Sequence, residues 1–150
     1  MWEYVSGSLG PPQPRFQPRT EVVFDGVTML TSPGLVMTPR HTTEALVDWA
    51  LEWIGSGSRS VRVADVGTGS GAVAVAVALR APNARIWATD DSEAAVTLAR
   101  ANVARQGLEE QVRVLLGDLL QPVPGELDLV LANLPYHAAA RSRCPSEIAC

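Results

Sequence analysis

The sequence predicts an α/β fold: a parallel sheet with helices on both faces. Three observations lead to this prediction. From residue 61 onward, short β-branched runs alternate with helix-like segments. The first run, VRVADV at residues 61–66, stops in the glycine-rich segment GTGSG at residues 67–71. The later runs also stop at acidic or amide residues, and the carboxyl ends of parallel strands are where such sheets bind ligands.

Composition and charge narrow the classes of function. The chain has 150 residues, 47% hydrophobic and 19% charged, as expected of one globular domain. A net charge of −4 without a basic cluster argues against a nucleic-acid partner. No apolar run reaches the roughly 18 residues of a membrane span, and the first residues do not form a signal peptide, so we expect a cytoplasmic protein without a membrane partner. Histidines and cysteines do not cluster at ligand spacing, so no metal site is expected.

The chain is expected to divide into three parts. Residues 1–20 are rich in proline and glycine, which disfavours helix and predicts a poorly ordered arm. Residues 21–136 carry the folded core. Residues 137–150 show no strand or helix period and are predicted to form an irregular tail.

The core is expected to open with a small hairpin. Two short β-prone runs, residues 21–24 and 27–30, flank the dipeptide Asp25-Gly26. This dipeptide supplies the positive φ angles of a two-residue hairpin turn.

A helix is expected next. Thr38-Pro39 is typical of an N-cap followed by proline in the first turn, and the helix is predicted to run to Ile54. Its apolar residues at three- and four-residue spacing predict one buried stripe. The predicted stripe consists of Ala45, Leu46, Trp49, Ala50, Trp53 and Ile54.

After the glycine-rich segment, predicted helices alternate with predicted strands. Ser92 is expected to cap one helix at its start, and Gly107 to end it in the left-handed conformation. The predicted elements are a helix at 72–79, a strand at 85–89, a helix at 93–106 and strands at 111–116 and 127–132.

Two nucleotide-like cofactors fit the glycine-rich segment. Residues 67–72 match the dinucleotide pattern G-x-G-x-x-G/A, and Asp90 follows about twenty residues later, where a ribose-binding acid is expected. An NAD-binding Rossmann module is therefore one alternative. The other depends on the residues around the segment: Asp65 before it, Asp118 after the third strand, and Asn-Leu-Pro-Tyr at 133–136.

The motifs DVGTGSG, ATD, GDLL and ANLPY together resemble the class I S-adenosylmethionine-dependent methyltransferases. Within that class the chain is most similar to the HemK-type enzymes, which methylate a glutamine side-chain amide in peptide chain release factors. The likeness spans residues 23–136. It includes Thr38-Pro39-Arg40 and Glu44, where that family has a PR-x-x-T-E type segment.

The resemblance implies a Rossmann-like sheet, S-adenosyl-L-methionine as cofactor and a protein substrate. Asp90 would accept hydrogen bonds from the ribose hydroxyls, and Asp118 from the adenine amino group. Because aspartate is also common in turns and at helix starts, a purely structural role stays open for both acids. The expected cofactor-binding residues are Asp65, Gly67, Thr68, Gly69, Gly71, Asp90, Asp118 and Asn133.

Residues 133–136 carry the expected chemistry. The lone pair of an amide nitrogen is delocalised, and a site that accepts hydrogen bonds from both N–H groups can raise its electron density. The side-chain oxygen of Asn133 and the carbonyl of Leu134, held by Pro135, could supply the two acceptors. Tyr136 could stack on the planar acceptor group. A turn that merely ends the strand is the plainer alternative.

The sequence departs from the family at two places before its end. Leu134 stands where release-factor enzymes usually carry proline, and their N-terminal helical domain has no counterpart here. The motif Asn-Leu-Pro-Tyr is also similar to that of ribosomal-RNA adenine dimethyltransferases, so adenine N6 methylation is the second alternative.

The chain also lacks the last three strands of the family's sheet, so the resemblance suggests a truncated or frame-shifted member. The edge of the fourth strand would then be exposed and could pair with a second copy in a homodimer. An inactive remnant that binds S-adenosylmethionine is a further alternative.

Overall fold

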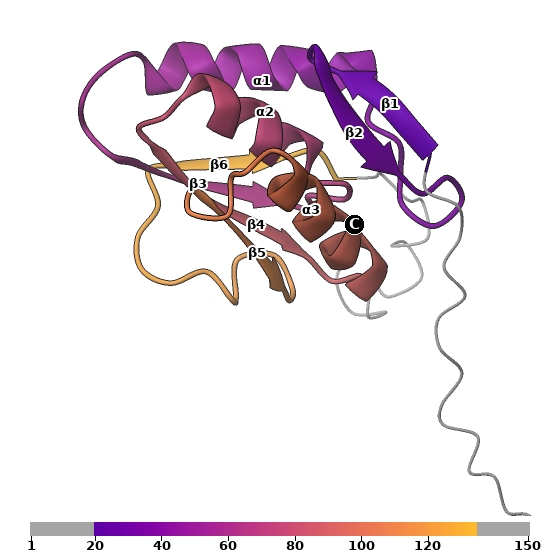
Figure 1. The fold of residues 1–150 in the computed structure, drawn as a ribbon. Helices are drawn as coiled ribbons and strands as arrows, with labels where there is room; N and C mark the ends of the chain where they lie inside the picture. Colours follow the sequence, from indigo (N-terminus) through magenta and orange to yellow (C-terminus); the bar gives the residue numbers. More distant parts are fainter. Residues whose placement is uncertain (1–19, 135–150) are drawn as a thin grey trace, which may run out of the picture.

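The computed structural model describes residues 20–134 (Figure 1). It opens with the predicted hairpin, β1 (Thr20–Phe24) paired antiparallel to β2 (Val27–Thr31). Asp25 and Gly26 have φ angles of 47° and 75°, as a two-residue hairpin turn requires. The hairpin is confirmed, although Thr20, predicted in the arm, already belongs to β1. The rest of the predicted arm lies outside the described residues, as does the tail.

Helix α1 (His41–Ile54) begins later than predicted. Its N-cap is Arg40, in an extended conformation and without a side-chain hydrogen bond to the helix. The predicted cap at Thr38 is therefore wrong. Proline disfavours helix for the residue before it but does not oblige a helix to start at the proline, and the chain stays extended through Arg40.

The predicted apolar stripe of α1 is also wrong in part. Trp49 and Trp53 are 53% and 49% exposed, whereas Val47, absent from the prediction, is fully buried. Three- and four-residue spacing fits more than one stripe when a helix carries apolar residues on several sides. The buried stripe consists of Thr43, Val47, Ala50 and Ile54.

Four parallel strands form the central sheet, in the order β5-β4-β3-β6. The parallel, Rossmann-like α/β class is thus confirmed. β6 pairs only with β3 among the described residues, so its other edge is free there, as predicted for the fourth strand of this sheet. The strands are β3 (Val61–Val66), β4 (Ala84–Asp90), β5 (Val112–Leu116) and β6 (Leu129–Ala132).

Helices α2 (Ala72–Arg80) and α3 (Glu93–Arg105) connect the strands. Within residues 20–134, all three helices lie on one side of the sheet (Figure 1), so the helices predicted for its other face are not found among these residues. Most of the helices' buried apolar residues share one core cluster with alternate residues of the strands, whereas Ala95 and Leu98 of α3 pack with Val36 in a second one. Burying each Val, Ile or Leu of such a core contributes about 1.5–3 kcal/mol. The predicted cap is confirmed: Ser92 Oγ accepts from the Ala95 amide, and Gly107 has a φ of 67°.

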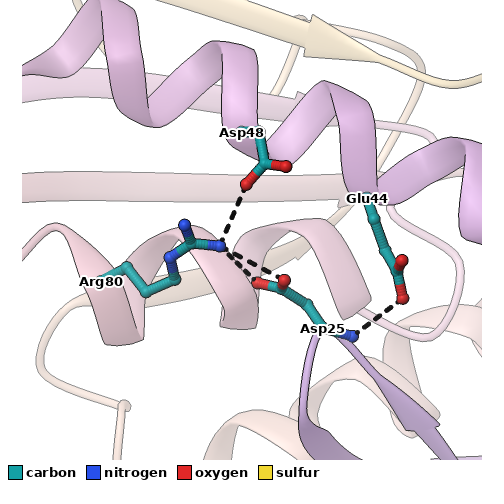
Figure 2. Close-up of polar contacts among 4 residues, drawn as sticks. All are labelled: Asp25, Glu44, Asp48 and Arg80. Atoms are coloured by element: carbon teal, nitrogen blue, oxygen red, sulfur yellow. Dashed lines mark hydrogen bonds and ion pairs between the residues drawn. The ribbon is translucent and has the colours of Figure 1, made fainter.

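A polar cluster holds the hairpin turn against α1 and α2 (Figure 2). Arg80, at the end of α2, donates to both carboxylate oxygens of Asp25 and to Asp48 of α1. Glu44 accepts a hydrogen bond from the Asp25 amide at 3.3 Å. The first turns of α1 are therefore tied to the hairpin.

Asn102 makes a second, buried link. Its side chain is inaccessible to solvent, and its Oδ1 accepts from the Leu30 amide at 2.7 Å. Its Nδ2 donates to the carbonyl of Leu30 at 2.9 Å and to that of Ser70 at 2.8 Å. One amide thus joins β2, α3 and the glycine-rich segment. No helix among the described residues is long and apolar enough to cross a membrane.

Candidate functional site

The glycine-rich turn between β3 and α2 needs glycine at two positions for different reasons. Gly71, the N-cap of α2, has a φ of 81°, and a Cβ there would stand 3.1 Å from the Cβ of Ala99 on α3. Gly67 has a φ of 67°, and a Cβ there would stand 2.4 Å from Cδ2 of Leu134. Glycine lets α2 approach α3 and lets the end of β6 lie against the turn.

Asp90, at the end of β4, holds this turn in place. Its Oδ2 accepts from the Gly69 amide at 2.9 Å, and its Oδ1 accepts from the Ser92 amide at 3.0 Å. A carboxylate oxygen can accept two hydrogen bonds, so each oxygen retains one acceptor position. Asp90 can therefore hold the glycine turn and still accept hydrogen bonds from a ligand.

Asp65, in β3 beneath the turn, is 2% exposed. Its Oδ2 accepts a hydrogen bond of 2.6 Å from the hydroxyl of Thr68. Burial raises the pKa of Asp65 to about 6, an effect partly offset by hydrogen bonds from Thr68 and the Ala74 amide, while the charge of Asp90 adds to the rise. The cost of ionising this carboxyl would fall if a cation were bound beside it.

Asn133 follows β6 and faces α1. Its Nδ2 donates to Oγ1 of Thr43, in the first turn of α1, at 2.8 Å. Thr43 is only 5% exposed. Because one end of the Asn133 amide is held in this way, its Oδ1 remains available as an acceptor.

A cavity of about 440 Å³ lies between these groups, within the usual size of small-molecule sites. Six of the predicted site residues line it: Asp65, Gly67, Thr68, Gly69, Asn133 and Leu134. The remaining lining residues are Met37, Thr38, Pro39, Arg40, Thr42, Thr43, Ser70, Ala72 and Val73.

Other predicted site residues lie elsewhere. Gly71 ends the glycine turn against Ala99 of α3, Asp90 accepts from the Gly69 amide, and neither residue lines the cavity. Asp118 is exposed in the turn after β5, and the adjacent Gly117 donates its amide to the Asp90 carbonyl at 3.0 Å. Asp118 is thus brought near Asp90 but not to the cavity. Pro135 and Tyr136 lie outside the described residues.

The extended segment before α1 was missed as part of the site. Residues 37–40 and Thr43 line the cavity, although no site role was predicted for them. The PR-x-x-T-E likeness was the available signal, because it falls on Pro39, Arg40, Thr43 and Glu44.

Comparisons with known proteins bear on the fold and the family of the chain. The family model described as the methyltransferase small domain matches residues 43–146. A release factor glutamine methyltransferase of Gloeobacter violaceus is 50% identical over 106 residues, which cover 70% of this chain and 37% of that protein. One from Bordetella pertussis is 47% identical over 105 residues, covering 69% and 38%. The chain therefore spans less than half the length of these relatives.

Solved structures share the fold. The 16S rRNA N2 methyltransferase of T. thermophilus, in complex with AdoMet and guanosine, has a TM-score of 0.65 at 21% identity and covers 85% of this chain and 35% of that one. A tRNA methyltransferase of M. jannaschii has a TM-score of 0.64 at 21% identity, covering 80% and 36%.

Proposed function

The chain belongs to the family of methyltransferase small domains, and from this membership we propose that it transfers a methyl group from S-adenosylmethionine to the side-chain amide nitrogen of a protein glutamine. The observation that carries the proposal is the amide of Asn133 at the cavity, bound through Nδ2 to Thr43 and lying close to the glycine turn. The names of the relatives support glutamine in a release factor as the acceptor.

The cavity fits the amino-acid end of the proposed cofactor. When bound, S-adenosylmethionine supplies a methyl group on a sulfonium, which a nucleophile can displace. The amino-acid end of the cofactor carries an ammonium group, and Asp65 is a buried carboxyl in the cavity wall whose ionisation a cation would favour. We assign the ribose hydroxyls to the remaining acceptor positions of Asp90, and the adenine amino group to Asp118.

The acceptor chemistry follows from the end of β6. An amide nitrogen is a weak nucleophile because its lone pair is delocalised. Asn133 Oδ1 would accept one N–H of the glutamine amide, and the carbonyl of Leu134 would accept the other, which aims the lone pair at the methyl group. Pro135 would hold that carbonyl and Tyr136 would stack on the amide plane.

Adenine N6 methylation is the second candidate, because Asn-Leu-Pro-Tyr also suits an exocyclic amine on a planar ring. The net charge of −4 favours a protein acceptor over RNA. Membership of a methyltransferase family also favours S-adenosylmethionine over NAD as the cofactor.

Parallel incubations separate these functions. The chain is mixed with S-adenosylmethionine and either a glutamine-containing peptide or an adenine-containing oligonucleotide, and methylated product is measured by mass spectrometry. We expect product from the peptide only, and loss of product in Asn133→Ala. Methylated oligonucleotide would favour the adenine alternative. Calorimetric binding of S-adenosylmethionine with neither product would indicate the inactive remnant.

We also propose that two copies associate through the edge of β6 that no strand within residues 20–134 pairs with. An unpaired parallel edge exposes backbone donors and acceptors that a second strand can satisfy. Light scattering should then give the mass of a dimer, and a mass of 16.0 kDa at all concentrations would contradict the proposal.

A further inference from the structure

We infer that Thr43 is a positioning residue that holds the side-chain amide of Asn133 in place with its oxygen toward the methyl acceptor, an inference that rests on the proposed function. The Thr43 hydroxyl contacts Asn133 Nδ2 at 2.8 Å across a sequence separation of 90 residues. The two side chains come from α1 and from the segment after β6, and both line the cavity.

An asparagine amide is symmetric in shape but not in hydrogen bonding. Rotation by half a turn about its last torsion exchanges the oxygen and the NH₂ group, and both orientations are intrinsically accessible. In the rotated orientation the NH₂ group of Asn133 would face the NH₂ group of the glutamine, and two hydrogen-bond donors cannot bond to each other. In the structure the Thr43 hydroxyl accepts from Nδ2, and this bond holds the amide in the orientation in which Oδ1 is left to accept.

The Thr43 hydroxyl is itself held firmly. The residue is 5% exposed, and its amide donates to the Arg40 carbonyl at 2.9 Å in the first turn of α1. The neighbouring Glu44 accepts from the Asp25 amide, and Asp25 and Asp48 share Arg80 (Figure 2). The hairpin cluster therefore fixes the turn of α1 that carries Thr43.

A core packing role is the competing explanation, because Thr43 belongs to the buried stripe of α1. Two substitutions separate the roles. Thr43→Val keeps the shape and removes the hydroxyl, whereas Thr43→Ser keeps the hydroxyl and removes the methyl group. A positioning role depends on the hydroxyl and a packing role on the methyl group.

The kinetic test uses the full chain with S-adenosylmethionine and the glutamine peptide. We expect kcat of Thr43→Val to fall about 10- to 100-fold, as when a partner that orients a site residue is lost. The dissociation constant of S-adenosylmethionine should stay within about threefold, and Thr43→Ser should regain most of kcat. Equal loss in both variants, or no loss in Thr43→Val, would overturn the inference.

A second readout does not depend on activity. The side-chain NH₂ resonances of Asn133 are assigned by ¹⁵N NMR of the labelled chain, through their loss in Asn133→Ala. In Thr43→Val they should shift and exchange faster with water, while Thr43→Ser keeps the native positions. Unchanged resonances in Thr43→Val would overturn the inference. If the wild-type chain methylates nothing, the proposed function fails, and these resonances still decide whether Thr43 orients Asn133.

Discussion

The side chain of Leu134 lies directly over Gly67, so that a Cβ on this glycine would stand 2.4 Å from Leu134 Cδ2. Gly67 also has a φ of 67°, a backbone conformation that residues with a Cβ rarely adopt. A side chain at position 67 would therefore strain the backbone and force the Leu134 side chain to move.

Gly67→Ala should consequently destabilise the chain. We expect the free energy of unfolding to fall by about 1–3 kcal/mol, because the substitution combines backbone strain with a steric overlap. Gly107→Ala is the matched control, since Gly107 has the same φ of 67° and nothing lies within 4 Å of a Cβ there, so it should lose only the backbone term, about 1 kcal/mol. Urea denaturation of both variants measures the difference, and equal stabilities would contradict this contact.

The pH dependence of stability should report the carboxyl of Asp65. Burial raises its pKa from 3.8 to about 6, so the folded chain binds this proton more tightly than the unfolded chain does. The free energy of unfolding should therefore decrease by about 3 kcal/mol as the pH rises from about 4 to above 6, and then level off. Asp65→Asn should lack this component. Parallel pH curves for the two proteins would show that Asp65 is not buried in this way.

Loss of a carboxylate oxygen from Asp90 should weaken cofactor binding. Asp90→Asn removes the negative charge and leaves one oxygen to accept from the amides of Gly69 and Ser92, which bond to one oxygen each in the native chain. A lost charge-assisted hydrogen bond costs about 1.5–3 kcal/mol, so we expect the dissociation constant of S-adenosylmethionine to rise at least about tenfold. The neighbouring Asp91 is exposed, and Asp91→Asn serves as the calorimetric control. Equal affinities would remove Asp90 from the site.

Asn102→Ala should cost more stability than removal of the ion pairs at the hairpin turn. The substitution leaves the Leu30 amide and the carbonyls of Leu30 and Ser70 without their partner, which we expect to cost about 2–4 kcal/mol. Arg80 is 47% exposed, and Arg80→Ala should cost less than about 1 kcal/mol. Thermal unfolding of both variants compares the two links, and the reverse order would refute this ranking.

Local signals account for most of the fold that could be predicted from the sequence. The Asp25-Gly26 turn, the Ser92 cap and the alternation of strands and helices depend on neighbouring residues, and the structure confirms them. The buried face of α1 was harder to predict, because Trp49 and Val47 both fit helical spacing and only the packing against α2 and the core decides which is buried.

The sequence predicted individual residues of the site but not the contacts between them. Asp65, the glycine turn and Asn133 were found because each ends or follows a predicted strand. The bond between Thr43 and Asn133 joins residues 90 positions apart, so no local pattern contains it. Likewise, the support that Asp90 gives to Gly69 depends on how far β4 extends beside β3.

The most direct test of the central claim is to locate the transferred methyl group by tandem mass spectrometry. A peptide with one glutamine is incubated with the chain and isotope-labelled S-adenosylmethionine, beside an otherwise identical peptide with asparagine in its place. We expect one labelled methyl group on the glutamine side-chain nitrogen and none on the asparagine peptide or with Asn133→Ala. A label on any other atom, or label that persists in Asn133→Ala, would contradict the assignment of Asn133 to glutamine methylation.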